Sequence, residues 1–320
     1  MSATALVGIA RMRPVPLVFE MRTRLAISER VAIAFFAYIT LAAGVLHLAA
    51  RDVGFIAALN AVTLATLLAL RRYRERAAWL AGAANLFPAL LLLVTYRESG
   101  LLLTPDSTHH LDYVFIRWDR ALLQSQVVHA VLQAGAPWLE HYLELAYLLC
   151  YPLVPLGVAA IQYGSHRGAT RESVAQRRRA LDDFWAAVLL ATLFIYAEYP
   201  FFPLTPPRVL FGDMPGPHVA PLLRRLNFWL LDHYSVQACI FPSGHVAAVT
   251  AVALAVRKHV PRLGALFLFL AASVAVATVY GRYHYAADAV AGAMVGVAAY
   301  AAAAFLTQRC AVFDVQENPH

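Results

Sequence analysis

Charged side chains are scarce in this sequence. Only 14% of its 320 residues are Asp, Glu, Lys or Arg, against about a quarter in an ordinary soluble domain, whereas 61% are hydrophobic. This composition excludes a soluble globular enzyme. Several uninterrupted apolar runs reach the roughly 20 residues that cross a bilayer as a helix, so membrane spans organise the chain.

Lysine and cysteine are rare as well. Lys258 is the only lysine among 26 basic residues, which outnumber 19 acidic residues for a net charge of +7. In a membrane protein, excess arginine in short loops marks the cytoplasmic side, so this charge does not indicate a nucleic-acid partner. Cys150, Cys239 and Cys310 fall at different predicted depths and give neither a disulfide framework nor a metal cluster.

Eight apolar runs predict an all-α, multi-pass transmembrane helical bundle. They span residues 31–50, 53–70, 77–96, 138–161, 182–203, 243–256, 263–280 and 286–307. The sixth run has few apolar residues after Gly244, so we expect it to be short, tilted or extended backward through Cys239 and Ile240. With the N-terminus inside, 18 basic residues face the cytoplasm and 8 face outward, the asymmetry expected of eight alternating spans. Both termini are then cytoplasmic.

The runs divide the chain into five parts. These are a cytoplasmic segment 1–30, N-terminal spans 31–96, an outer segment 97–137, a membrane core 138–308 and a cytoplasmic tail 309–320. In the outer segment, apolar residues between Leu111 and Leu123 recur at helical spacing opposite Asp112, Asp119 and Arg120. This pattern predicts an amphipathic helix that either lies in the membrane interface or packs on the bundle as a lid.

A short polar motif, Phe-Pro-Ser-Gly-His at residues 241–245, precedes the sixth run. We expect Pro242 at the first helical position, where the free amides of the helix start form an anion site. Ser243 adds a hydroxyl, and Gly244 lets an oxyanion approach the backbone. His245 can exchange a proton near neutral pH. A phosphate group fits this arrangement, whereas a plain capping turn needs no histidine.

A second motif leads into the last run. His284 and Asp288 are four residues apart, which on a helix places both side chains on one face. The carboxylate can then accept the imidazole N–H and leave the other ring nitrogen free as a nucleophile. The alternatives are a charge that interacts with the helix dipole for Asp288 and a packing role for either histidine.

The predicted topology places the motifs at one membrane depth, on the outer side. Arg208 follows a proline-rich exit from the fifth run, and His245 and His284 begin two helices there. Together with Arg282, these residues form a group typical of phosphate binding. Glu198, near the same end of the fifth run, is predicted either to pair with Arg208 or to recognise a hydroxyl of an acceptor.

The FPSGH stretch and the HYAAD stretch at 284–288 resemble the second and third signature motifs of the type 2 phosphatidic acid phosphatase superfamily. The resemblance covers roughly residues 182–307 and implies a six-helix phosphatase-like core in the C-terminal part of the chain. It also implies an active site at the membrane surface that needs no cofactor.

The resemblance implies a role for each matching residue. His284 attacks a phosphoester to form a phosphohistidine, and Asp288 orients it. His245 protonates the leaving alcohol and then deprotonates the acceptor. Ser243 and Gly244 cradle the phosphate oxygens.

The phosphate clamp departs from that of simple lipid phosphatases in the superfamily. They carry arginine six residues before the third-motif histidine, where this chain has Thr278, and Arg282 is the nearby substitute. They also carry lysine seven residues before the first-motif arginine, where Phe201 precedes Arg208. The proline-rich exit is more similar to the inositol phosphorylceramide synthase and sphingomyelin synthase branch, which transfers phospho-headgroups between lipids.

These features predict a lipid phosphotransferase, with a lipid phosphatase as the alternative and a transporter as a remote one. The substrate is a phospholipid or a polyprenyl phosphate, and the sequence leaves donor, acceptor and oligomeric state open. No metal is predicted, because His109, His110, His218 and His233 have no companion ligands at metal-binding spacing. Abundant arginine and alanine are compatible with a high-GC bacterium, and so with its plasma membrane.

Overall fold

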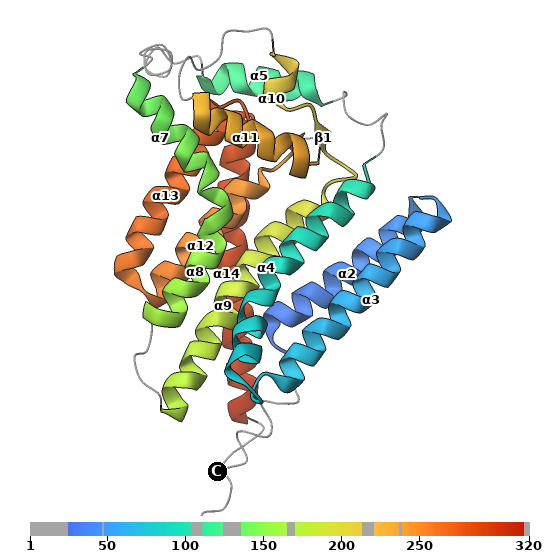
Figure 1. Cartoon of the computed structure of the whole chain (residues 1–320), viewed down its shortest axis with the longest axis vertical. Coiled ribbons are helices and arrows are strands. Elements are labelled where there is room, and N and C mark those ends of the chain that lie inside the picture. Colours follow the sequence, from blue (N-terminus) through green and yellow to red (C-terminus); the bar gives the residue numbers. More distant parts are fainter. Residues whose placement is uncertain are drawn as a thin grey trace, which may run out of the picture.

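The computed structural model describes residues 25–46, 48–103, 111–123, 136–164, 170–212, 221–236 and 239–316. In this part of the chain the fold is a helical bundle (Figure 1). Its helices are α2 (Ile27–Val45), α3 (Ala50–Tyr73), α4 (Ala78–Leu101), α5 (Asp112–Leu123), α7 (Pro137–Leu148), α8 (Cys150–Gly164), α9 (Arg171–Ala197), α10 (Pro207–Leu210), α11 (Pro221–Tyr234), α12 (Gly244–His259), α13 (Pro261–Tyr280) and α14 (Ala286–Gln316). Two-residue strands, β1 (Pro203–Leu204) and β2 (Cys239–Ile240), form one antiparallel pair. The prediction of an all-α membrane bundle is confirmed.

Each of the eight predicted runs coincides with a helix or a bent pair of helices, but fewer qualify as full spans. Among the described residues, six helices are long and apolar enough to cross a membrane: α2, α3, α4, α9, α13 and α14. The pair α7 and α8, bent by 62°, makes a seventh if it counts as one span. The remaining helix, α12, has only 16 residues, so six or seven helices qualify as spans by length and composition, against the eight runs in the sequence.

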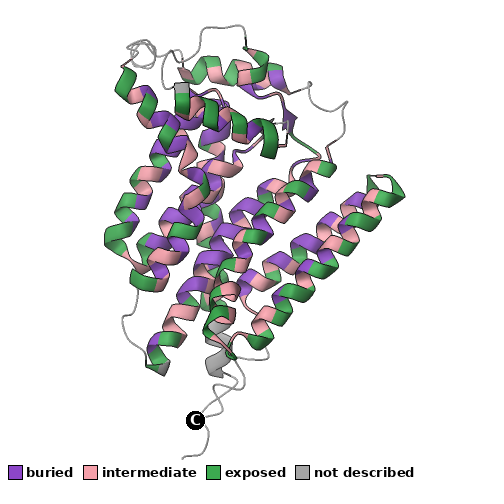
Figure 2. Cartoon of the chain, in the orientation of Figure 1, coloured by how far each residue is buried: buried purple, intermediate pink, exposed green. Residues whose placement is uncertain are grey.

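The position of α12 explains its short, weakly apolar sequence. It lies inside the bundle and contacts α8, α9, α13 and α14 (Figure 1), and residues around its whole circumference are buried (Figure 2). Its buried side chains are alanine and valine, and small residues of this kind let helices approach closely. Because α12 faces protein instead of lipid, it does not need a full hydrophobic span. It begins at Gly244 and is not extended backward, since Cys239 and Ile240 form β2.

Helices α5 and α11 lie across one end of the bundle (Figure 1), here called the α5 end. Helix α5 packs on the bundle through contacts with α14, and its predicted place in the membrane interface stays a prediction. Asp112 and Phe115 are buried, whereas Tyr113, Trp118 and Leu122 are exposed, with the Trp118 ring in contact with that of Phe115. The segments that flank α5, with His109 and His110, lie outside the described residues, as do residues 1–24 and His218.

The N-terminal helices attach to the core through α9. Asp182 of α9 accepts hydrogen bonds at the start of α2, from the Ile27 amide at 3.3 Å and from the Ser28 amide and hydroxyl at 3.2 and 2.5 Å. Further along, the Tyr38 hydroxyl donates to the carbonyl of Ala197 at 2.8 Å. Amides in the first turn of a helix have no partner within the helix, so Asp182 caps α2 from a neighbouring helix.

We expect Asp182→Ala to destabilise the protein by about 1 kcal/mol, the usual cost of losing a helix cap. The change is measured as a lower Tm of the detergent-solubilised protein. Glu75→Ala is the matched control, because the Glu75–Arg178 ion pair is substantially exposed, at 41% and 36%, and such pairs contribute little. A native Tm in Asp182→Ala would contradict the capping role.

Candidate active site

Three stretches that are distant in the sequence meet at the α5 end. β1, in the proline-rich segment after α9, pairs with β2, which leads into the FPSGH stretch. The amide of Ser243 donates to the carbonyl of Asp288 at 3.1 Å. The amide of Arg208 donates to the carbonyl of Arg282 at 2.9 Å. Main-chain hydrogen bonds therefore hold both polar motifs and the proline-rich exit together.

The start of α14 orients His284 toward Asp288. Nδ1 of His284 lies 3.4 Å from Oδ2 of Asp288, and the same oxygen accepts the amide of Tyr285 at 3.2 Å. Asp288 is fully buried, whereas the His284 side chain is 11% exposed. This geometry favours the tautomer with its proton on Nδ1, which leaves Nε2 with a free lone pair.

His245 lies in the first turn of α12, with its ring centroid 5.8 Å from that of His284. The N-cap of α12 is Ser243, whose Oγ accepts from the amide of Val246 at 3.5 Å. The expectation that Pro242 occupies the first helical position was therefore wrong by two residues, because the helix starts only after the serine cap. The buried Ser243 hydroxyl serves this cap, and the amides of Gly244 and His245 follow it.

Two tyrosine rings lie close to that of His245. The ring centroids of Tyr147 and Tyr151 lie 5.7 and 5.8 Å from that of His245. The two residues flank the break between α7 and α8, so the bend brings both rings to the histidine. Tyr147 also stacks on Tyr283 at 3.8 Å, which connects the two histidine-bearing segments through aromatic contacts.

A buried glutamate anchors the loop that carries His284. Glu144 of α7 is 1% exposed and accepts the hydroxyl of Tyr283 at 2.6 Å. Asn227 donates to the same oxygen, Oε2, at 2.8 Å, and the other oxygen, Oε1, pairs with Arg224 of α11 at 2.7 Å. Sequence analysis did not identify this cluster. A glutamate inside a predicted span is a signal that could have found it, because an ionisable group is expensive to bury there.

The two arginines of the predicted phosphate site, Arg208 and Arg282, make different contacts. The charge of Arg208 acts on His245 and Tyr151, so this half-buried arginine lies near His245. Arg282 has a positive φ of 60° and donates from Nη1 to the carbonyl of Phe211 at 3.2 Å.

Thr278 occupies the position where simple lipid phosphatases of the superfamily carry arginine. It is fully buried, and its carbonyl accepts the amides of Tyr283 and His284 at 2.9 and 3.0 Å. Its contribution is to shape the turn before α14. Glu198 is the C-cap of α9, and within the described residues it forms no ion pair with Arg208.

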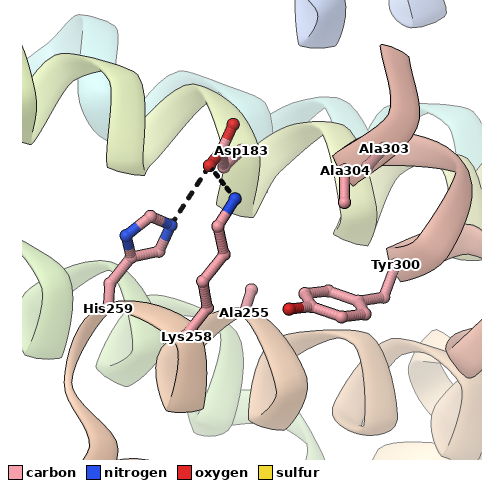
Figure 3. A pocket seen from close by; sticks show the side chains of 7 residues that line it. All are labelled: Asp183, Ala255, Lys258, His259, Tyr300, Ala303 and Ala304. Atoms are coloured by element: carbon pink, nitrogen blue, oxygen red, sulfur yellow. Dashed lines mark hydrogen bonds and ion pairs between the residues drawn. The ribbon is translucent and has the colours of Figure 1, made fainter. Parts of the chain in front are cut away.

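A second polar cluster lies at the far end of α12 (Figure 3). There Lys258 Nζ and His259 Nε2 approach Asp183 Oδ2 of α9 at 2.5 and 3.3 Å, and Tyr300 of α14 lines the same small pocket. A helix of 16 residues separates its two ends by about 24 Å, so this cluster is not part of the histidine site. Its ion pairs tie α9 to α12.

The described residues contain no group of three or more His, Cys, Asp or Glu side chains arranged for a metal ion. Two histidines and Arg208 lie at one end of a helical membrane bundle, a set of groups suited to binding phosphate. A family model of the PAP2 superfamily matches residues 114–302, which is more than half of the chain.

The chain therefore belongs to the PAP2 superfamily, and it is an integral membrane enzyme of the lipid phosphatase type. The match begins within α5 and ends in α14, and so includes all of the described site. No curated protein and no solved structure matches the chain.

A substitution at Gly292 tests the packing between α14 and the FPSGH stretch. A Cβ at this position in α14 would lie 2.5 Å from the carbonyl oxygen of Ser243, so Gly292→Ala must shift the helix or the loop. A displacement near 1 Å at an active site costs up to about 100-fold in rate, and we expect phosphate release from a lipid phosphate to fall at least tenfold. Gly82→Ala, where nothing lies within 4 Å, should keep native activity, and equal activities in the two variants would contradict this packing.

Proposed function

We propose that the protein is a lipid phosphotransferase that uses a phosphohistidine. Nε2 of His284 forms a bond to phosphorus while the bond to the leaving alcohol breaks, and His245 gives that alcohol its proton. The hydroxyl of the acceptor then attacks the same phosphorus, the bond to His284 breaks, and His245 takes the proton back. Asp288 keeps the proton of His284 on Nδ1 and stabilises the positive ring.

The observation that carries this proposal is the arrangement of the two rings. His284 contacts a fully buried carboxylate at 3.4 Å, and His245 lies 5.8 Å away between centroids. One phosphorus and the oxygen bonded to it can therefore lie within reach of both rings. Arg208 and the first amides of α12 are the groups available to the remaining phosphate oxygens.

Transfer to an alcohol is favoured over hydrolysis by the branch that the proline-rich exit resembles. The buried ring of Tyr147 lies 5.7 Å from that of His245, and Tyr283 stacks on it, so one side of His245 is covered by aromatic rings. Hydrolysis is the second candidate, because the superfamily match covers lipid phosphatases as well and water uses the same three residues. An inositol phosphate headgroup, phosphatidate and a polyprenyl phosphate are all compatible donors.

The α5 end is proposed to face outward, with both termini in the cytoplasm of a bacterial plasma membrane. The C-terminal end of α14 lies at the opposite end of the bundle (Figure 1), as do Arg177, Arg178 and Arg179 in the first half of α9. Arginine near span ends marks the cytoplasmic side.

We expect His284→Ala to abolish labelling of the protein by a lipid that carries radioactive phosphorus, because the attacking nitrogen is lost. His245→Ala should lower steady-state turnover at least 100-fold, within the range of a general acid–base contribution. His233→Ala is the control, since this exposed histidine on α11 packs only on Trp229 and Tyr234 among described rings. Native labelling of His284→Ala would overturn the nucleophile assignment.

The acceptor is identified by incubating detergent-purified protein with labelled phospholipids, with and without candidate alcohols, and separating the products. A new phospholipid that forms only with an alcohol, and is lost in His284→Ala, is the expected result. Free phosphate at the same rate with and without alcohol would replace the transferase by the phosphatase. Absence of both products for every lipid in the panel would contradict the proposed function.

A further inference from the structure

Helix α5 holds the beginning of α14 through Asp119. Oδ1 of Asp119 accepts the amide of Ala286 at 2.7 Å and the amide of Ala287 at 3.3 Å. These are the first two residues of α14, whose amides have no partner inside the helix. A carboxylate at this end of a helix also interacts favourably with the helix dipole. Asp119 thus caps α14 from a segment 167 residues away.

The capped turn is the one that aligns the histidine. Asp288 is the third residue of α14, and its Oδ2 is shared by the amide of Tyr285 and by Nδ1 of His284. At 3.4 Å the contact with His284 is long for a hydrogen bond, so a small movement of the first turn is enough to break it. The position of the Asp288 carboxylate therefore depends on the contact that Asp119 makes with the same turn.

Helix α5 contacts the other two stretches of the site as well. Asp112 accepts the amide of Thr205 at 2.8 Å, in the proline-rich exit before Arg208. The buried ring of Phe115 lies 4.9 Å from Phe241, which begins the FPSGH stretch, and 5.9 Å from Tyr285. One short helix therefore connects all three stretches that form the site.

The burial of Asp119 is costly, which argues for a role. Burial raises its pKa to about 6, and the nearby charge of Asp288 acts in the same direction, while the amides of Ala286 and Ala287 oppose the rise. A carboxyl group with a raised pKa beside an active site is a functional candidate. An apolar side chain would avoid this cost but would leave both amides without an acceptor.

We propose that Asp119 is a positioning residue for His284 and Asp288, and that α5 is a clamp that fixes the three stretches of the site. Asp119 acts through the first turn of α14 and does not touch the substrate. The proposal rests on the proposed function, since it assumes that His284 is the nucleophile. It predicts that loss of the hydrogen-bond acceptor at position 119 slows phosphoenzyme formation more than it weakens lipid binding.

The test compares Asp119→Ala, Asp119→Asn and a control on the exposed side of α5, Arg117→Gln. We expect Asp119→Ala to lower kcat for phosphoenzyme formation about tenfold or more and to leave KM within about twofold of native. The reason is that a small displacement of catalytic groups lowers the reaction rate steeply. Asp119→Asn should recover most of kcat, because asparagine is about as good a helix cap as aspartate. Arg117→Gln should match the native enzyme.

Each other outcome overturns the proposal. A lower Tm in Asp119→Ala with native kcat per folded molecule would make the residue structural only, and an increase in KM alone would make it a binding residue. If Asp119→Ala does not fold, Asp119→Glu, which shifts the carboxylate by one methylene, must show the lower kcat instead. Failure of the native protein to form a phosphoenzyme with any lipid would count against the proposed function, whereas a labelled native protein and equally fast Asp119 variants would count against the clamp alone.

Discussion

Hydrogen bonds to backbone amides and carbonyls at helix ends hold this site together. Inside a bilayer every backbone polar group needs a partner within the protein, and only helix ends leave such groups open. The site lies where α9 and α13 end and α12 and α14 begin. There, Ser243 caps α12, the carbonyl of Thr278 receives two amides after α13, and Asp119 and Asp288 receive those around the start of α14. The residues that bind these backbone groups therefore also position the reactive side chains.

Close packing by small side chains keeps these ends in register. α12 is surrounded by other helices, with buried alanine and valine on all sides, and Gly292 of α14 allows the carbonyl of Ser243 to approach where a Cβ would clash. In lipid, helices associate through such packing and through polar contacts. The Asp183 cluster at the far end of α12 and the Glu144 cluster beside the site are polar contacts of this kind.

Aromatic rings and α5 lie around the two histidines. Tyr147 and Tyr151 lie on one side of His245, and the contacts of Phe115 with Phe241 and Tyr285 lie on the α5 side. Tyr113 and Trp118 of α5 are exposed and are types that favour the membrane interface, and the Trp118 ring also contacts those of Phe115 and Phe241. The helix that fixes the site thus also offers a surface suited to the lipid boundary.

The sequence by itself determined the membrane class, the helical runs and the two polar motifs, because apolar length, helical spacing and local residue chemistry are properties of neighbouring residues. It left the sixth helix as short, tilted or extended backward, and only the packing around α12 explains why it is short. The tertiary structure decided the rest. Asp119 caps a helix 167 residues away, and Glu144 binds Tyr283 across 139 residues. Such partners depend on the path of the whole chain, and no local pattern encodes which distant carboxylate will meet which helix end.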